Sequence, residues 1–264
     1  LLSALFVSLF NGFYSRMVSI LSLSISIISL AGATIVMLRK MLKGSVRICN
    51  CASPSNHTAI ITGATSGIGE ATAVELAKRH WKLILGCRDM LAGELIKNRI
   101  ELETGNKNVS TLKLDLEDFE SVKSFVSSMP EDTLVHLLIN NAGIMSTQPR
   151  YNNALDNIDA NMAVNFFGHF VLTIMLQNTF KRTFQKENKK PRIVIVSSAL
   201  AKHGQLNGVS KPLSAAPEKD WQASTSYKNS KLACLLFARE LEKRWSSANL
   251  DNFVDVYCIV TGGM

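Results

Sequence analysis

Residues 62–69 read Thr-Gly-Ala-Thr-Ser-Gly-Ile-Gly, and this stretch decides the expected fold of the 264-residue chain. It follows HTAIIT (57–62), an apolar run rich in β-branched residues, and it opens the helical pattern GIGEATAVELAKRH (67–80). Glycines at such a strand-to-helix junction let the backbone turn tightly and approach a pyrophosphate at the helix N-terminus. The spacing G-x-x-x-G-x-G differs from the common dinucleotide fingerprint G-x-G-x-x-G, and an ordinary strand-to-helix turn is the alternative interpretation.

Strands and helices alternate along the rest of the chain. Further strands are expected at 81–87, 109–115, 134–140, 192–198 and 253–260, and helices at 90–103, 119–129, about 155–180 and 226–245. Apolar strands separated by amphipathic helices indicate a parallel sheet that is covered on both faces. We therefore expect a doubly wound, Rossmann-type α/β fold over residues 56–264, with neither an internal repeat nor a second domain.

Composition excludes some classes of protein. Hydrophobic residues make up 47% of the chain and charged residues 19%, which is too apolar for a disordered protein. Part of the net charge of +8 lies in the run KRTFQKENKKPR (181–192), which lacks interleaved aromatic residues and which we interpret as a solvated loop, so no nucleic-acid partner is expected. The five scattered cysteines show no metal-ligand spacing, and they favour a reducing compartment over structural disulfides.

The low charge fraction is concentrated in residues 17–38, a run of 22 residues without a charged side chain. As a helix, this run would span about 33 Å, which matches the hydrocarbon core of a bilayer. Basic residues follow at once and no acid stands among them, which places the C-terminal side in the cytosol. We expect a single-pass transmembrane anchor at 17–38, a basic juxtamembrane linker at 39–55, and an apolar segment of unassigned status at 1–16.

Other interpretations of this segment remain open. A cleaved signal peptide would use Ala31-Gly32-Ala33, although its apolar run would be shorter and its positive charge would lie on the other flank. A buried core helix is a second alternative, and Met17 as the true start a third. The sequons at 56–58 and 108–110 would be accessible only in a lumenal enzyme of opposite topology.

Four further positions carry residue types suited to cofactor binding and proton transfer. Arg88 ends the second strand and favours NADP, because an arginine there can contact a 2′-phosphate, while Asp89 is expected to cap the next helix. Tyr227 and Lys231 project from one face of a helix, and a cation beside a phenol makes it a better acid. Ser198 ends the fifth strand, where it can hydrogen-bond a substrate carbonyl. A surface i,i+4 pair and a strand cap are the alternatives.

Together these residues resemble the short-chain dehydrogenase/reductase family over about residues 55–262. The glycine motif, Asn140-Asn141-Ala142-Gly143, Ser198 and Tyr227-x-x-x-Lys231 occur in the order that the family shows. Within the family, the chain is most similar to the membrane-anchored retinol dehydrogenases, in the phrases CRDMLAGE (87–94), Asp115-Leu116, VNFFGHF (164–170) and SKLA (230–233).

The resemblance implies a cofactor site and a catalytic tetrad. Tyr227 would donate a proton to the carbonyl oxygen, Ser198 would orient that carbonyl, and Lys231 would hold the nicotinamide ribose. Asn165 would support a water that links Lys231 to solvent. The residues implied to contact NADP(H) are Gly63, Ser66, Gly67, Ile68, Gly69, Arg88, Asp115, Leu116, Asn141, Ala142, Gly143, Tyr227 and Lys231.

The resemblance also implies a function and exposes two departures. We expect an NADP-dependent oxidoreductase that interconverts an alcohol and an aldehyde or ketone, with a retinoid or another lipophilic carbonyl as substrate. It would be a protein of the endoplasmic reticulum membrane with its catalytic domain in the cytosol, and a homodimer through the helices that bear Asn165 and Tyr227. Val260-Thr261-Gly262-Gly263 lacks the usual proline, and the chain stops at Met264 before a seventh strand. We therefore expect a C-terminally truncated domain with its sixth strand at the sheet edge. A truncated, non-catalytic dinucleotide-binding protein is the alternative.

Overall fold

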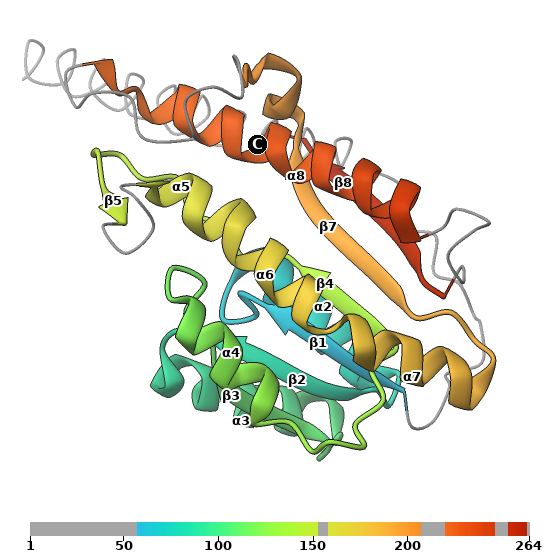
Figure 1. Ribbon diagram of the computed structural model, residues 1–264. Helices are drawn as coiled ribbons and strands as arrows, with labels where there is room; N and C mark the ends of the chain where they lie inside the picture. Colours follow the sequence, from blue (N-terminus) through green and yellow to red (C-terminus); the bar gives the residue numbers. More distant parts are fainter. Residues whose placement is uncertain (1–56, 153–157, 207–219, 246–252, 263–264) are drawn as a thin grey trace, which may run out of the picture. The chain divides into compact units, whose positions relative to one another are not determined.

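The computed structural model describes residues 57–152, 158–206, 220–245 and 253–262, and these form a parallel six-stranded sheet in the order β3-β2-β1-β4-β7-β8 (Figure 1). The order reverses between β1 and β4, so a crevice is expected at the carboxyl ends of these two strands. The doubly wound fold is thereby confirmed. The strands are β1 (Thr58–Thr62), β2 (Lys82–Cys87), β3 (Val109–Lys113), β4 (Leu137–Asn140), β7 (Arg192–Ser198) and β8 (Asp255–Thr261).

Helices cover both faces of the sheet (Figure 1). On one face, Phe125, Leu172 and Phe237 contribute to a buried cluster with strand residues such as Ile60. On the other face, small and branched side chains such as Ala73 pack on the alternate strand residues. Burying each large apolar side chain contributes about 1.5–3 kcal/mol. The helices are α2 (Gly67–Lys78), α3 (Met90–Thr104), α4 (Phe119–Ser127), α6 (Gly168–Met175), α7 (Gln177–Glu187) and α8 (Ala223–Trp245).

Short polar side chains fix where two of these helices begin. Asp89 precedes α3, and its carboxylate accepts the backbone N–H groups of Leu91 and Ala92 at 2.9 and 3.2 Å. Asp118 accepts the N–H of Glu120 at the start of α4 in the same way. Each carboxylate satisfies N–H groups that have no partner within the helix, so the sequence-based expectation for Asp89 is confirmed.

The long helical stretch expected over about 155–180 is confirmed from Ala160 onward, although it is divided into several segments. A two-stranded hairpin of β5 (Tyr151–Asn152) and β6 (Ile158–Asp159) leads into the short helix α5 (Ala160–Met162), the π-helical turn η2 (Ala163–Phe167), α6 and then α7. Asp159 caps α5 by accepting the N–H groups of Asn161 and Met162. A cap inside an apolar pattern is easily missed, because helical periodicity continues on both sides of it.

The solvated loop expected at 181–192 is also wrong for its first half. Residues 181–187 form the end of α7, which closes at Asn188 in the left-handed conformation. Lys181 lies with its Nζ 5.4 Å from the ring centroid of Phe253, so part of the basic charge packs against an aromatic face.

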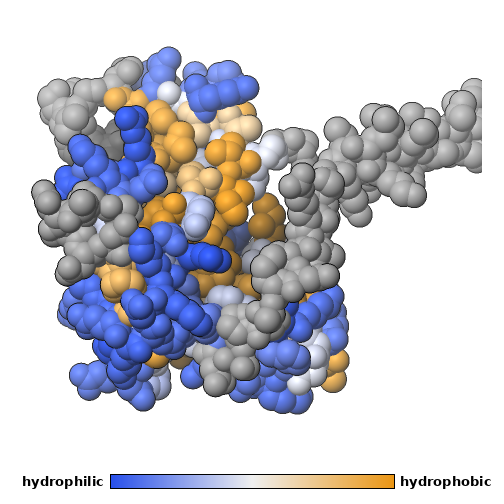
Figure 2. All heavy atoms as spheres, turned by 90° about the vertical axis from the view of Figure 1, so that its right-hand side faces the viewer, coloured by the Kyte–Doolittle hydropathy of each residue, from blue (hydrophilic) through white to orange (hydrophobic). Residues whose placement is uncertain are grey.

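Strand β8 lies at the edge of the described sheet, as the sequence predicts, and pairs there with β7. The side chains of Tyr257, Ile259 and Val260 are about half exposed. Figure 2 shows hydrophobic side chains gathered between hydrophilic ones on the face that lies to the right in Figure 1. The expected anchor at 17–38, its flanking segments and Gly263 lie outside the described residues. Among the helices that are described, none has the length and apolarity needed to cross a bilayer.

Candidate active site

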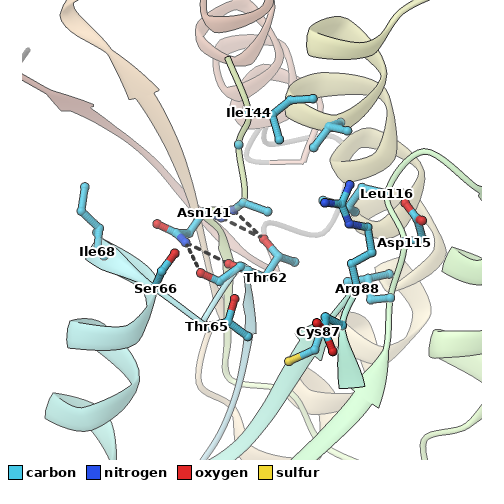
Figure 3. A pocket seen from close by; sticks show the side chains of 18 residues that line it. Thr62, Thr65, Ser66, Ile68, Cys87, Arg88, Asp115, Leu116, Asn141 and Ile144 are labelled. Carbon is cyan, nitrogen blue, oxygen red and sulfur yellow. Dashed lines mark hydrogen bonds between the residues drawn. The ribbon is translucent and has the colours of Figure 1, made fainter. Parts of the chain in front are cut away.

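A cavity of about 490 Å³ opens at the carboxyl ends of β1, β2 and β4, where the strand order reverses (Figure 3). Its walls come from the loops that follow these strands and β3. A position at the carboxyl ends of parallel strands is where open α/β sheets bind ligands. The cavity is lined by Thr62, Gly63, Thr65, Ser66, Gly67, Ile68, Gly86, Cys87, Arg88, Asp89, Leu114, Asp115, Leu116, Asn141, Ala142, Gly143, Ile144 and Val164.

The glycine loop forms one wall at the N-terminus of α2. Gly63 has a φ of 65°, and a Cβ on Gly69 would lie 2.2 Å from the carbonyl oxygen of Gly63, so neither position accepts a side chain without distortion. Ser66 occupies the N-cap position of α2, but its side chain accepts no hydrogen bond from the N–H groups of the helix. The first N–H groups of the helix therefore face the cavity uncapped, and together with the helix dipole they suit a phosphate.

Thr62 and Asn141 join the glycine loop to the end of β4. The side-chain amide of Asn141 donates to the carbonyl oxygens of Thr62 and Gly63 at 2.9 and 3.1 Å. In return, Thr62 Oγ1 accepts the backbone N–H groups of Asn141 and Ala142, both at 3.0 Å. These bonds, which Figure 3 draws as dashed lines, make the two walls one rigid unit.

Arg88 extends from the end of β2 beside Leu116 (Figure 3). Its side chain is exposed, and its Nη1 lies 3.9 Å from Oε2 of Glu117. Lys113 Nζ donates to the Arg88 carbonyl oxygen at 2.6 Å, which brings a second cation to the same loop. Cys87 is buried beneath, and burial raises the pKa of its thiol to about 11. Cations and carboxylates are therefore mixed at this end of the cavity, with Arg88 the cation among the lining residues and Asp89 and Asp115 the acids.

At the opposite end, Asn165 and Lys231 meet behind Gly143. A Cβ on Gly143 would lie 3.2 Å from Lys231 Nζ and 3.4 Å from Asn165 Oδ1. Asn165 is held by two bonds to Ile144, accepting its N–H at 2.7 Å and donating to its carbonyl oxygen at 2.9 Å. Lys231 Nζ donates to the Val196 carbonyl oxygen at 3.0 Å. Burial lowers the pKa of Lys231 from its ordinary value.

Tyr227 lies one helical turn before Lys231 on α8, with the ring centroid 5.8 Å from Lys231 Nζ. Ser198 ends β7 and caps the 3₁₀ turn η3 (Ala199–His203) by accepting the Leu200 N–H at 3.3 Å. Helix α8 packs against both β7 and η3. The strand-cap interpretation of Ser198 is thus correct, and the cap leaves its hydroxyl proton available to an acceptor.

The structure sorts the predicted site residues into two groups. The cavity is lined by ten of them, Gly63, Ser66, Gly67, Ile68, Arg88, Asp115, Leu116, Asn141, Ala142 and Gly143, and Gly69 packs beneath the loop. Asn165, Ser198, Tyr227 and Lys231 do not line it, although Asn165 and Lys231 lie directly behind Gly143. The sequence predicted no role for Thr62 or His169, although Thr62 begins the glycine motif at 62–69 and His169 lies in the family-like stretch at 164–170.

One cluster elsewhere has metal-ligand composition. His57, His136 and Glu187 bring one ligand atom each within 4.8 Å of one another. However, the backbone N–H of Thr58 donates to His136 Nδ1 at 3.0 Å, so Nε2 carries the proton and donates to Glu187 at 3.1 Å. Neither ring nitrogen of His136 then offers a free lone pair, and we interpret the cluster as a structural hydrogen-bonded tie.

The reversed strand order, the glycine turn and a cavity at the carboxyl ends of the strands define a Rossmann-type dinucleotide-binding protein. The chain belongs to the short chain dehydrogenase family, whose family model matches residues 57–210.

Curated relatives and solved structures agree with this assignment. The chain is 37% identical to retinol dehydrogenase 11 of Mus musculus over 82% of its own length and 65% of the relative's. The chain is also 37% identical to retinol dehydrogenase 12 of Mus musculus, over 86% of its own length and 69% of the relative's. A structure of an uncharacterized protein from Mycobacterium paratuberculosis matches with a TM-score of 0.61 and 30% identity, over 79% of this chain and 68% of that one. An alcohol dehydrogenase from Thermococcus sibiricus, complexed with 5-hydroxy-NADP, shares the fold at a TM-score of 0.59 and 22% identity, over 80% and 77%.

Proposed function

We propose that this chain is an NADP(H)-dependent oxidoreductase that interconverts an alcohol and an aldehyde or ketone. The observation that carries the proposal is the approach of Lys231 Nζ and Asn165 Oδ1 to Gly143, because it joins the tetrad to a cavity built for a dinucleotide. A nicotinamide bound there would supply or accept a hydride. The remaining tasks of binding, orientation and proton transfer fall to side chains of this chain.

The cavity fits a phosphorylated dinucleotide. Uncapped N–H groups at the start of α2 suit the pyrophosphate, and Gly63 leaves room for close approach of the backbone. Arg88 supplies positive charge in the cavity wall where an adenosine 2′-phosphate would lie, and Lys113 donates to the carbonyl oxygen of Arg88. This charge favours NADP(H) over NAD(H), since a guanidinium binds a phosphate through strong charge-assisted hydrogen bonds.

The proposed acid is Tyr227, which donates its phenolic proton to the substrate oxygen as that oxygen gains charge. Lys231, buried and 5.8 Å from the tyrosine ring centroid, stabilises the phenolate that is left. Ser198 donates its hydroxyl proton to the same substrate oxygen and orients it. Asn165 holds the loop at Ile144 in place and supports the path by which Lys231 recovers a proton from solvent.

The substrate class and cellular setting extend the proposal. Relatives named retinol dehydrogenases and the apolar run at 17–38 support a lipophilic carbonyl, met by a catalytic domain at the cytosolic face of the endoplasmic reticulum membrane. A homodimer through the helices that bear Asn165 and Tyr227 is supported by exposed apolar side chains on α6 and α8, including Phe170, Ile174 and Leu236.

The test is NADPH consumption by the detergent-solubilised full chain with retinaldehyde, beside a Tyr227→Phe variant. We expect turnover by the parent alone and NADPH binding by both, because the substitution removes only the transferable proton. Equal activity in the variant would refute Tyr227 as the acid. NADPH binding without turnover on a panel of carbonyl substrates would favour the alternative of a non-catalytic dinucleotide-binding protein. A glycosidase-sensitive mass shift would overturn the cytosolic orientation.

A further inference from the structure

Helix α6 and the π-helical segment that precedes it carry a row of polar side chains that point into the protein interior. Asn165, His169 and Thr173 recur every four residues and are each at most 3% exposed. The adjacent side chains Leu172 and Leu176 are fully buried and apolar. Buried polar groups in such a setting lower stability unless each is hydrogen-bonded, so the partners of this row indicate its purpose.

The two ring nitrogens of His169 have different partners. Nδ1 lies 3.0 Å from the carbonyl oxygen of Asn165, which can only accept, so Nδ1 carries the proton. Nε2 lies 2.8 Å from Thr62 Oγ1. Burial lowers the pKa of His169 to about 4, so the ring is neutral at physiological pH and Nε2 is an acceptor.

The bonds of Thr62 agree with this tautomer. Its hydroxyl oxygen already accepts two backbone N–H groups, from Asn141 and Ala142, which occupies both lone pairs. Its single proton must therefore be donated. His169 Nε2 at 2.8 Å is closer than the alternative acceptor, the Ile139 carbonyl oxygen at 3.3 Å.

A continuous hydrogen-bonded path follows from these assignments. It runs from the backbone of Asn141 and Ala142 in the cavity wall, through the Thr62 hydroxyl and the His169 ring, to the backbone of Asn165. The same carbonyl oxygen of Asn165 also accepts from Cys234 Sγ at 3.1 Å, on the helix that carries Lys231. Elements far apart in sequence are thus joined through one imidazole.

We infer that His169 is a positioning residue that couples the cofactor wall, through Thr62, to the backbone of Asn165 in the catalytic centre. This inference rests on the proposed function. His169 is 3% exposed and does not line the cavity, so it acts through its two partners. A leucine could fill the same space beside Leu172, but it could form no hydrogen bond to Thr62 or to Asn165. A polar ring at this position therefore indicates that the two residues are coupled through it.

Two substitutions separate the two arms of the ring. In His169→Asn, the amide nitrogen occupies the place of Nδ1 and keeps the bond to Asn165, while the bond to Thr62 is lost. In His169→Gln, the amide oxygen occupies the place of Nε2 and keeps the bond to Thr62, while the bond to Asn165 is lost. His80→Asn is the matched control, since His80 is exposed and its φ of 59° suits asparagine.

The measurements are the dissociation constant for NADPH, kcat and KM with a carbonyl substrate, and the melting temperature, all on the full chain. We expect His169→Asn to weaken NADPH binding about tenfold with little change in kcat. We expect His169→Gln to bind NADPH normally and to lose about tenfold in kcat. If both variants lost NADPH affinity and kcat equally, in proportion to a fall in melting temperature, the inference would be overturned and His169 would be a packing residue.

A second pair guards against variants that fail to fold. Thr62→Ser keeps the hydroxyl and Thr62→Val removes it, so only the valine variant should weaken NADPH binding about tenfold. Equal binding by this pair would also overturn the coupling. If the parent chain bound no NADPH, the proposed function would be refuted. If the parent bound NADPH without turnover, only the proposed catalysis would be refuted, and the bond from His169 to Thr62 would still be tested by NADPH affinity.

Discussion

Oε2 of Glu117 lies 2.9 Å from Nη1 of Arg150 and 3.9 Å from Nη1 of Arg88, so one carboxylate stands between two guanidinium groups beside the cavity. Its side chain is mostly shielded from solvent, and it offsets positive charge at the place where a 2′-phosphate would bind. We interpret Glu117 as a competitor of the phosphate for Arg88.

Removing this charge should tighten cofactor binding. Glu117→Gln keeps the shape of the side chain and is expected to lower the NADPH dissociation constant by up to about fivefold, the range of an exposed ion pair. Binding of NADH, which lacks the phosphate, should be unchanged. Glu120→Gln on α4, which breaks a surface pair with Lys123, is the control. Weaker NADPH binding in the Glu117 variant would show that Glu117 only holds Arg88 in position.

Arg88 itself should decide between the two cofactors. Arg88→Gln is expected to raise the NADPH dissociation constant by about 10- to 100-fold, the worth of charge-assisted hydrogen bonds to a phosphate, and to leave NADH binding nearly unchanged. Fluorescence titration with each nucleotide measures both constants. The control is Arg244→Gln, whose partner Glu240 lies on the same helix. Equal weakening for the two nucleotides would remove Arg88 from the specificity argument.

Local sequence patterns predicted the sheet well. Strand β7 was expected at 192–198 and spans those residues, because its apolar run follows Pro191 and ends at two serines. The wall residues Asn141 to Gly143 were implied by the family resemblance, whereas the cap at Asp89 was predictable from local sequence, since it lies where a strand meets a helix. Information within about ten residues decides such features.

The parts that sequence patterns missed depend on distant contacts. At the π-helical turn that interrupts the helical pattern, the Asn165 side chain bonds to the backbone of Ile144, 21 residues earlier. The partners Thr62 and His169 are 107 residues apart. Neither contact leaves a periodic signal, so one chain alone could suggest the tetrad but not the network behind it.

The close approach at Gly69 should make it intolerant of any side chain. In Gly69→Ala, the new Cβ would lie 2.2 Å from the Gly63 carbonyl oxygen, a backbone atom that cannot move away freely. We expect a loss of about 1–3 kcal/mol in unfolding free energy and loss of NADPH binding. Gly105→Ala is the control, since its φ of 72° brings strain of about 1 kcal/mol with no contact and no cofactor nearby. Normal NADPH binding by the Gly69 variant would contradict this picture of the loop.

His169 should make the fold sensitive to acid. Its pKa is about 4 in the folded chain and about 6.5 when unfolded, so its contribution to stability is complete above pH 6.5 and is lost as the pH falls toward 4. We expect it to account for a loss of about 2 kcal/mol between pH 7 and pH 5. His57, whose pKa burial also lowers, acts in the same direction. Urea unfolding of the parent and His169→Gln isolates the His169 part, and parallel pH profiles would contradict it.

Asp159 should position Tyr227 from a distance. Its carboxylate accepts Ser226 Oγ and Trp221 Nε1, both at 2.5 Å, and it caps α5, so the residue that precedes Tyr227 is tied to the start of another helix. Asp159→Asn replaces one acceptor with a donor that faces these groups. We expect a loss of about 2 kcal/mol in stability, a lower kcat, and a shifted Trp221 fluorescence.

The affinity for NADPH should not change in this variant, because Asp159 does not line the cavity. Asp118→Asn is the matched control, since Asp118 also caps a helix but lies on α4, on a different element from Tyr227. Asparagine caps helices well, so that variant should retain stability and kcat. If the two variants lowered kcat equally, the hydrogen bond between Asp159 and Ser226 would have no part in catalysis. A loss of kcat confined to Asp159→Asn would show that Tyr227 is held in place by a carboxylate 68 residues before it in the chain.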